Sequence, residues 1–126
     1  MGTFRTAIDV ASLSGQAYER LHALVDTGAT YTWLPRPVLE RLGVEPEEDW
    51  PFVLADGRER TYPITTVRVR IAGRSRLTVA VFGDPGTEPL LGVVTLEEFG
   101  LAVDPIHRRL TRVPSLLKAT QQAGAI

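Results

Sequence analysis

The sequence predicts an all-β protein with a single main domain. Its dominant hydrophobic period is two residues, because apolar and polar side chains alternate through several runs, as in strands with one buried face. Helical patterns are confined to two short segments. With 126 residues, 44% of them hydrophobic, the chain is long enough for one buried core but too short for two lobes of ordinary size.

Three pairs of strands are expected in the first two thirds of the chain. They cover residues 4–10 with 17–25, residues 52–64, and residues 67–71 with 77–81. Gly15, Gly57 and Gly73 interrupt these runs and predict the turns of the three pairs. The turn at Asp56-Gly57 is the best defined of them, because both residue types accept the positive φ of a tight hairpin.

Two short helices are expected, and both have recognisable ends. Residues 37–42 begin with proline and are followed by Gly43, an arrangement typical of helix starts and stops. Residues 95–99 begin with a Thr-x-x-Glu pattern, which predicts a capping box, and end before Gly100.

The last strands are expected at residues 101–103 and 108–113. The chain is therefore divided into a domain of residues 1–113 and a C-terminal tail of residues 114–126, for which the sequence predicts fraying or a weak helix.

Composition excludes several classes of function. The 14 Lys and Arg residues nearly balance the 15 Asp and Glu residues, so no basic field predicts a nucleic-acid partner. Because the chain has no cysteine, disulfides, thiol nucleophiles and thiolate zinc sites are excluded. His22 and His107 lack metal-ligand spacing, so we expect no metal and no cofactor. Without a signal peptide or an apolar run of roughly 18 residues, we expect no membrane association and a cytoplasmic location.

Residues 24–30, Leu-Val-Asp-Thr-Gly-Ala-Thr, are the segment with the clearest chemical signal. An aspartate directly after an apolar strand is costly to bury in its charged form, so Asp26 is expected to be either paired or functional. Gly28 allows the backbone to turn sharply and another backbone to come close. The structural alternative is an ordinary turn in which Asp26 caps nearby N–H groups.

This segment resembles the active-site loop of the retropepsin-like aspartic proteases. That family also has an apolar-apolar-Gly motif before a short C-terminal helix, which residues 90–92 and 95–99 match, and between the two motifs a flap hairpin, which residues 52–64 match. The resemblance covers residues 3–113. It implies a closed, barrel-like acid-protease fold with one or two short helices and a flap hairpin.

The resemblance also implies roles for individual residues. Asp26 would be one of two carboxylates that share a proton and activate a water molecule for attack on a peptide bond. Thr27 would lock the two active-site loops together, and Gly28 would make backbone contacts with substrate. The remaining substrate-binding candidates on the loop, the flap and the second motif are Ala29, Ala55, Asp56, Gly57 and Leu91.

A single chain does not contain both carboxylates, because the Asp-Thr-Gly motif occurs once and no Asp-Ser-Gly is present. We therefore expect a two-fold homodimer that cleaves a peptide or protein substrate with one Asp26 from each subunit. The alternatives are a non-catalytic dimerisation or peptide-binding module of the same fold, and a processing domain of a mobile-element polyprotein. Substrate sequence and biological target are not encoded in any motif that the chain contains.

The chain departs from the retroviral pattern at three places. Val93 and Val94 stand where many members have arginine and a polar residue, and Thr30-Tyr31 replaces a frequent acidic pair. The tail of residues 114–126 shows no clear strand of the kind that interleaves in retroviral dimers. The subunit contacts of this chain are therefore left open.

Overall fold

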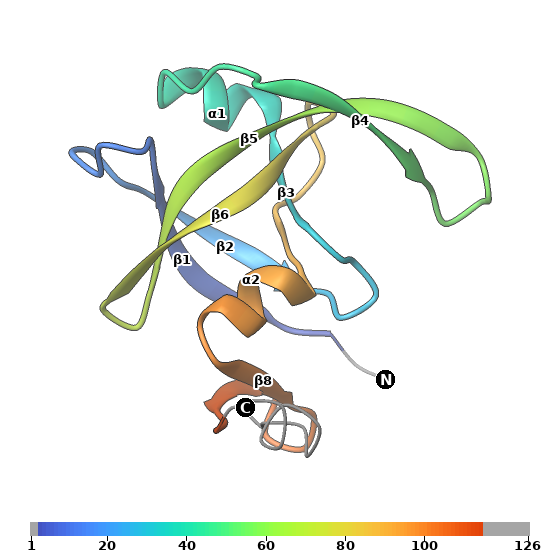
Figure 1. Cartoon of the computed structure of the whole chain (residues 1–126). Helices are drawn as coiled ribbons and strands as arrows, with labels where there is room; N and C mark the ends of the chain where they lie inside the picture. Colours follow the sequence, from blue (N-terminus) through green and yellow to red (C-terminus); the bar gives the residue numbers. More distant parts are fainter. Residues whose placement is uncertain (1–2, 115–126) are drawn as a thin grey trace, which may run out of the picture.

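The computed structural model describes residues 3–114 and consists mainly of strands (Figure 1). The elements in chain order are β1 (Arg5–Ala11), β2 (Glu19–Val25), β3 (Thr32–Pro35), α1 (Arg36–Arg41), β4 (Glu48–Val53), β5 (Glu59–Ile71), β6 (Arg74–Gly83), β7 (Leu90–Leu91), α2 (Val93–Glu98), β8 (Leu101–Asp104) and β9 (Arg109–Arg112). Within this part of the chain, no helix has the length and hydrophobicity needed to span a membrane.

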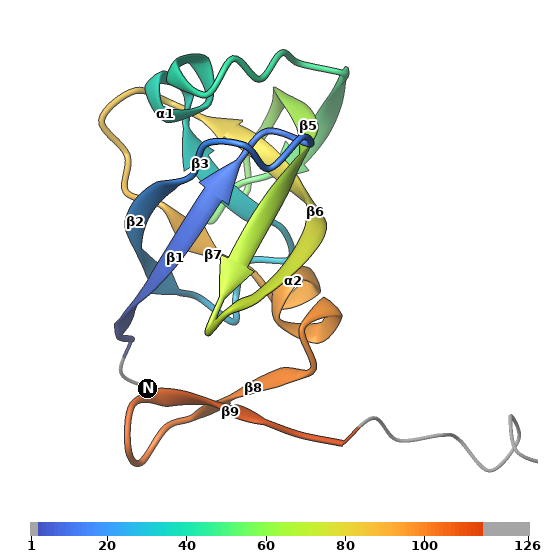
Figure 2. The ribbon, with the colours of Figure 1, turned by 90° about the vertical axis from the view of Figure 1, so that its left-hand side faces the viewer.

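Six strands close into a barrel. The main sheet has the order β1-β2-β7-β3-β6-β5-β4, and an additional antiparallel pairing of β1 with β5 closes all of its strands except β4 into a ring. Figure 2 shows β1 and β5 side by side at this closure. Strand β4 lies outside the ring and pairs with β5 alone, which leaves the β4–β5 hairpin free to project from the barrel. The predicted all-β, closed architecture with two short helices is confirmed.

The barrel interior is filled by alternate side chains of the strands, as the period of two predicts. On β5, Val67, Val69 and Ile71 are buried, while the residues between them are partly exposed. Leu39 of α1 and Leu96 of α2 join the same core cluster, so each helix packs one side chain into it. Burial of each such side chain contributes roughly 1.5–3 kcal/mol to folding.

Two hairpins extend the barrel. Strands β5 and β6 pair antiparallel through a turn at Ala72-Gly73, where both residues have positive φ (51° and 81°), which confirms the predicted hairpin at this glycine. Strands β8 and β9 form a separate two-stranded sheet, and three of its side chains pack against the core from outside, namely Leu101, Val103 and Leu110. The two predicted C-terminal strands are therefore present, and the tail beyond residue 114 lies outside the described residues.

The start of α2 differs from the prediction. The helix begins at Val93 rather than Thr95, its N-cap is Gly92, and no side chain caps it. The predicted capping box was wrong because the first N–H groups find partners on another segment: Val93 and Val94 donate to the carbonyl oxygens of Ala29 and Thr30, both at 2.9 Å. Thr95 is thus free to sit inside the helix.

Asp9 lies where the barrel closes. It faces Arg20 on β2 and Arg70 on β5, so one carboxylate bridges the strands on both sides of β1. Its oxygens accept hydrogen bonds from Arg20 at 2.8 and 3.2 Å and from Arg70 at 3.2 Å. The hydrogen bond from Arg20 is the main cause that lowers the pKa of Asp9 below its ordinary value of 3.8; burial opposes this effect and Arg70 reinforces it.

We expect Asp9→Asn to lower the free energy of unfolding by about 1–2 kcal/mol at neutral pH, because the charged form makes the stronger hydrogen bonds. Since folding lowers the pKa of Asp9, this contribution is complete above pH 3.8 and is lost as the pH falls through the lower, folded value. Denaturant unfolding measured between pH 2 and 7 should therefore show the two proteins converging in acid. Asp49→Asn, on the exposed face of β4, is the control and should leave stability nearly unchanged at every pH.

Candidate active site

The Asp-Thr-Gly segment forms a tight loop directly after β2. The backbone N–H of Gly28 donates to Oδ1 of Asp26 at 2.9 Å, and the N–H of Ala29 donates to the carbonyl oxygen of Asp26 at 3.1 Å. Asp26 is half-buried, whereas Thr27 and Gly28 are exposed. The loop therefore holds the carboxylate of Asp26 in one orientation and presents the next two residues at the surface.

Strand β7 connects this loop to the second predicted motif. Leu90 and Leu91 pair in parallel with Leu24 and Val25 of β2, and the N–H of Asp26 donates to the carbonyl oxygen of Leu91 at 3.1 Å. Two segments separated by more than sixty residues in the sequence thus lie next to each other at the candidate site. Leu91 itself is fully buried in the barrel core.

Gly92 is the point of closest backbone approach. A Cβ atom at this position would lie 2.4 Å from the carbonyl oxygen of Tyr31 and 3.0 Å from that of Ala29, both of them backbone atoms that are held in the loop. A side chain of any size would therefore push β7 away from the Asp-Thr-Gly loop. The glycine of the apolar-apolar-Gly motif is required here by packing.

A chain of buried hydroxyl groups continues from Gly92. Its N–H donates to Oγ1 of Thr32 at 3.1 Å, and this oxygen lies 2.6 Å from Oγ1 of Thr95. The hydroxyl of Thr95 lies 2.8 Å from that of Thr78, which donates to Oε1 of Glu98 at 2.6 Å. Because the chain starts at a donor and ends at an acceptor, every hydroxyl donates to the next one and none is left unsatisfied.

The β4–β5 hairpin is the predicted flap. At its tip, Leu54 and Arg58 are joined by a backbone hydrogen bond of 2.8 Å, and Gly57 has a φ of 85°. Asp56 accepts hydrogen bonds from the backbone N–H of Arg58 at 3.0 Å and from its guanidinium at 2.7 Å, and the backbone bond is the main cause that lowers the pKa of Asp56. The predicted turn at Asp56-Gly57 is thus present and ordered by its own side chain.

Aromatic side chains join the base of the flap to the segment that follows the Asp-Thr-Gly loop. Trp33 makes edge contacts with Phe52 and Tyr62, with ring centroids 5.0 and 4.9 Å apart, and Tyr31 contacts Trp50 at 5.4 Å. Each pair of this kind adds about 0.5–1.5 kcal/mol beyond the burial of its area. The flap base is therefore anchored to β3, while the tip lies beyond these contacts.

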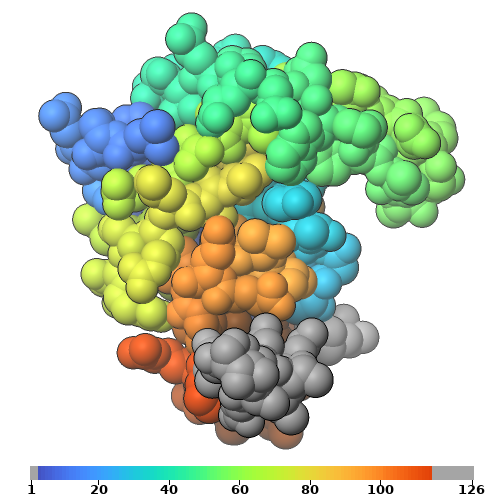
Figure 3. Space-filling view, in the orientation of Figure 1, coloured from blue at the N-terminus to red at the C-terminus, as the bar shows by residue number. Residues whose placement is uncertain are grey.

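A cleft of about 230 Å³ lies between the flap and the Asp-Thr-Gly loop. Its lining on the loop side is Gly28, Ala29, Thr30, Tyr31 and Trp33, and on the flap side Phe52, Val53, Leu54 and Ala55. In Figure 3 the flap projects past the loop, and the space beneath it is open to solvent.

Among the predicted substrate-binding residues, Ala29 and Ala55 both line this cleft, Ala29 on the loop side and Ala55 on the flap side. Asp56 and Gly57 lie at the flap tip beyond its lining, and Leu91 lies in the core beneath the loop. In residues 3–114, no group of three or more His, Asp or Glu side chains is arranged to hold a metal ion.

The chain was compared with known proteins at the level of sequence families and of structures. Residues 12–98 match the family model described as "gag-polyprotein putative aspartyl protease". The chain belongs to this family. No sequence among the curated proteins matches it.

Two solved retroviral proteases have the same fold. The EIAV protease, solved in complex with the inhibitor HBY-793, is 19% identical, with 79% of this chain and 89% of that chain covered and a TM-score of 0.58. The simian foamy virus (mac) protease is also 19% identical, with 75% and 94% covered and a TM-score of 0.52. The resemblance to retropepsin-like proteases, stated from the Asp-Thr-Gly loop, the flap and the second motif, is confirmed at the level of family and fold.

Sequence reasoning missed the three threonines of the hydroxyl chain. Thr32, Thr78 and Thr95 are buried on β3, β6 and α2, where a polar residue is unusual. Thr78 offered a signal, since it is the one polar residue in the apolar stretch of β6 from Leu77 to Phe82. The capping-box pattern concealed Thr95, because it supplied a local explanation for a residue whose partners are distant in sequence.

We expect Thr95→Val to destabilise the protein by about 1–3 kcal/mol, because the buried hydroxyls of Thr32 and Thr78 then lose their shared partner. Denaturant unfolding measures this loss, and amide hydrogen exchange at Gly92 should become faster, since its acceptor Thr32 is no longer held. Thr95→Ser keeps the hydroxyl and should restore the slow exchange. Equal exchange at Gly92 in all three proteins would contradict this role of the hydroxyl chain.

Proposed function

We propose that the chain is an aspartic endopeptidase that works as a homodimer, with one Asp26 from each subunit. The observation that carries the proposal is the geometry of the Asp-Thr-Gly loop, which we now call the catalytic loop. The N–H of Gly28 holds the Asp26 carboxylate, the backbone of Asp26 is hydrogen-bonded to β7, and a cleft covered by the flap lies beside the loop. Membership of an aspartyl protease family and the fold of retroviral proteases support it.

The chemistry requires two carboxylates in different protonation states. The ionised Asp26 of one subunit removes a proton from a water molecule, whose oxygen attacks the carbonyl carbon of the scissile peptide bond. The protonated Asp26 of the other subunit donates its proton to the carbonyl oxygen, giving a neutral tetrahedral intermediate. The carboxyl group that took the proton of water then gives it to the amide nitrogen, and the other carboxylate accepts a proton from a hydroxyl group of the intermediate. The carbon–nitrogen bond breaks, and a carboxylic acid and an amine are released.

The second carboxylate has to come from a second copy. The sequence contains one Asp-Thr-Gly motif, and within residues 3–114 no hydrogen bond or ion pair joins Asp26 to another acidic side chain. The exposure of Thr27 and Gly28 leaves the loop accessible to an identical loop across a two-fold axis.

Substrate would bind between the catalytic loop and the flap. The cleft there is lined by Tyr31, Trp33 and Phe52 together with small residues, and no charged side chain is among its lining residues in the described part of the chain. An apolar side chain of a peptide fits this lining, and backbone groups of the flap are available to hydrogen-bond an extended chain.

The alternative is a non-catalytic dimerisation or peptide-binding module that retains the loop. This alternative keeps the same fold and the same cleft, so the two functions differ only in whether the Asp26 pair activates water. A substitution of Asp26 that preserves its shape therefore separates them.

We expect Asp26→Asn to reduce peptide cleavage by at least about a hundredfold, because an amide can neither accept the proton of water nor share one with its partner. Cleavage is measured on a mixed peptide library with mass-spectrometric detection. The unfolding midpoint of the variant should stay close to that of the parent, so loss of activity does not reflect loss of fold. A parent protein that cuts no peptide, or a variant that cuts as fast, would support the non-catalytic module.

Mixing subunits tests the shared site. If active sites form only between two intact copies, then an approximately ninefold excess of Asp26→Asn protein should lower the activity per wild-type chain to about one tenth after subunit exchange. A ninefold excess of an unrelated protein of the same size is the control and should have no effect. Activity that is proportional to the wild-type concentration alone would show that each chain works by itself.

A further inference from the structure

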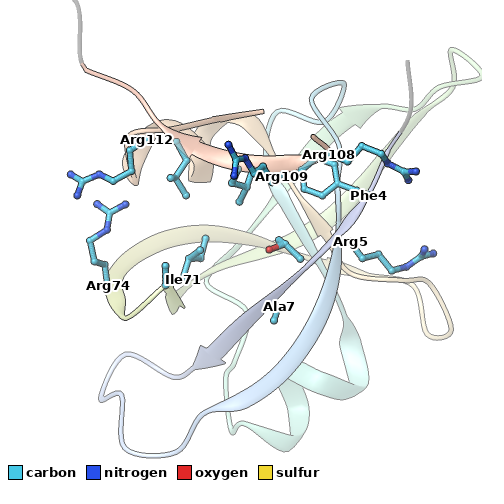
Figure 4. Close-up of a pocket in the computed structure, with 12 residues that line it drawn as sticks. Phe4, Arg5, Ala7, Ile71, Arg74, Arg108, Arg109 and Arg112 are labelled. Atoms are coloured by element: carbon cyan, nitrogen blue, oxygen red, sulfur yellow. The ribbon is translucent and has the colours of Figure 1, made fainter. Parts of the chain in front are cut away.

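A second cleft of about 590 Å³ lies between the barrel and the β8–β9 hairpin. It shares no lining residue with the cleft beside the catalytic loop. Five arginines line it, contributed by β1, β6, β9 and the β8–β9 turn: Arg5, Arg74, Arg108, Arg109 and Arg112. We call this feature the arginine groove. In Figure 4, Arg74 and Arg112 lie at one end of the groove and Arg5 and Arg108 at the other.

The positive charge of the arginine groove is only partly neutralised within the described residues. Arg5 pairs with Glu88 at 2.8 Å, and Arg109 lies 3.6 Å from Asp104. Arg74 and Arg108 donate instead to backbone carbonyl oxygens, those of Phe99 at 2.9 Å and Thr3 at 2.6 Å, which satisfy a hydrogen bond but carry no net charge.

Arg112 is the third arginine of the groove with no acidic partner within 4 Å in residues 3–114. The remaining residues of the chain supply no acidic side chain, since residues 1–2 and 115–126 contain neither Asp nor Glu. Among the described residues, therefore, the groove keeps an excess of positive charge that an anionic ligand could neutralise.

Backbone strain is found at the same place. Among residues 3–114, only Ala72 and Arg108 combine a side chain with a positive φ, at 51° and 53°, and both line the arginine groove. Glycine or asparagine adopts this conformation at lower cost, so the β8–β9 turn by itself does not favour arginine at position 108. Strained backbone of this kind is found more often at binding sites than elsewhere.

We propose that the arginine groove docks an acidic peptide segment of a protein ligand. Phe4, Ile71, Leu101 and Leu110 contribute apolar surface to the same cleft, so the segment it fits carries apolar side chains between its carboxylates. The volume of the groove lies in the range of roughly 300–1,000 Å³ that is usual for ligand sites. Guanidinium groups bind carboxylates through paired hydrogen bonds, which gives such a segment a defined position.

A second copy of the chain fits the groove less well. In a two-fold dimer whose axis passes through the groove, five arginines would face five arginines and repel one another. The acidic residues Glu45, Glu47, Glu48 and Asp49 lie at and before β4, at the opposite end of the molecule from β8 (Figure 1), so a second copy would have to reach the groove with its far end. A single nucleic-acid strand is disfavoured because stacking platforms need several aromatic rings, and Phe4 alone among the described lining residues is aromatic.

The test measures binding of a defined probe to the full chain. The probe is a fluorescein-labelled peptide Glu-Glu-Leu-Glu-Glu-Leu-Glu-Glu, and its control has glutamine in place of every glutamate. Protein carrying Asp26→Asn is used throughout, so that the probe is not cut, and binding does not depend on whether the chain is a protease. Fluorescence anisotropy should show saturable binding of the acidic peptide that weakens as salt rises to 0.15 M, where charges are screened beyond about 8 Å.

Two groove variants and one matched control locate the site. Arg108→Gly removes a charge and relieves the positive φ, so the protein should unfold at the same or a higher denaturant concentration while probe affinity falls by about fivefold or more. Arg112→Gln, on exposed β9, should weaken binding to a similar extent. Arg76→Gln removes an equally exposed strand arginine outside the groove and should leave affinity within about twofold of the parent.

The proposal is overturned by any of four results. These are equal binding of the glutamine peptide, equal loss of affinity in Arg76→Gln and the groove variants, displacement of the probe by a single-stranded oligonucleotide at lower concentration than by unlabelled acidic peptide, and dissociation of a dimer by Arg108→Gly or Arg112→Gln. The third result would assign the groove to nucleic acid, and the fourth would assign it to the subunit interface. Failure of the protease proposal would leave all of these measurements unaffected.

Discussion

The close backbone contact between Gly92 and the Asp-Thr-Gly loop is the constraint on which the candidate active site depends. Because no Cβ is present at Gly92, the backbone of β7 approaches the carbonyl oxygens of Ala29 and Tyr31, and the start of α2 can then donate two N–H groups to the loop. The carbonyl oxygens of the loop therefore accept the first N–H groups of α2, and these hydrogen bonds in turn fix the loop against the helix. This mutual support positions the loop, and the N–H of Gly28 orients the carboxylate of Asp26 within it.

The hydroxyl chain carries the same support into the core. Thr32 accepts a hydrogen bond from the N–H of Gly92 and donates one from its own hydroxyl group to Thr95. The candidate active site is thus connected to β6 and α2 through polar groups that all have hydrogen-bond partners. In this chain Val93 and Val94 occupy positions where retroviral members often have polar residues that tie the helix to the loop. The buried threonines provide a connection of that kind by a different set of side chains.

Charge is separated along the molecule. Acidic residues are common near the flap, which the aromatic contacts of Trp33 and Trp50 hold at one side of the barrel. The arginine groove lies at the end of the molecule near the β8–β9 hairpin. A net charge of −1 conceals this arrangement, because opposite charges at two ends cancel in the sum. Composition excluded a general basic surface, yet it carried no information about a local one.

Patterns within a few residues of one another were enough to predict the strands, the Asp56-Gly57 turn and a sharp turn of the backbone after Asp26, since periodicity and turn preference act along the backbone. Closure of the barrel was needed to bring together residues that are far apart in sequence. Whether Thr95 caps its own helix or hydrogen-bonds Thr32, and whether Arg108 in the β8–β9 turn also lines a charged groove, depends on which surfaces the closed ring places in contact. A local sequence pattern does not predict these contacts, because they arise from the packing of segments that are far apart in the sequence.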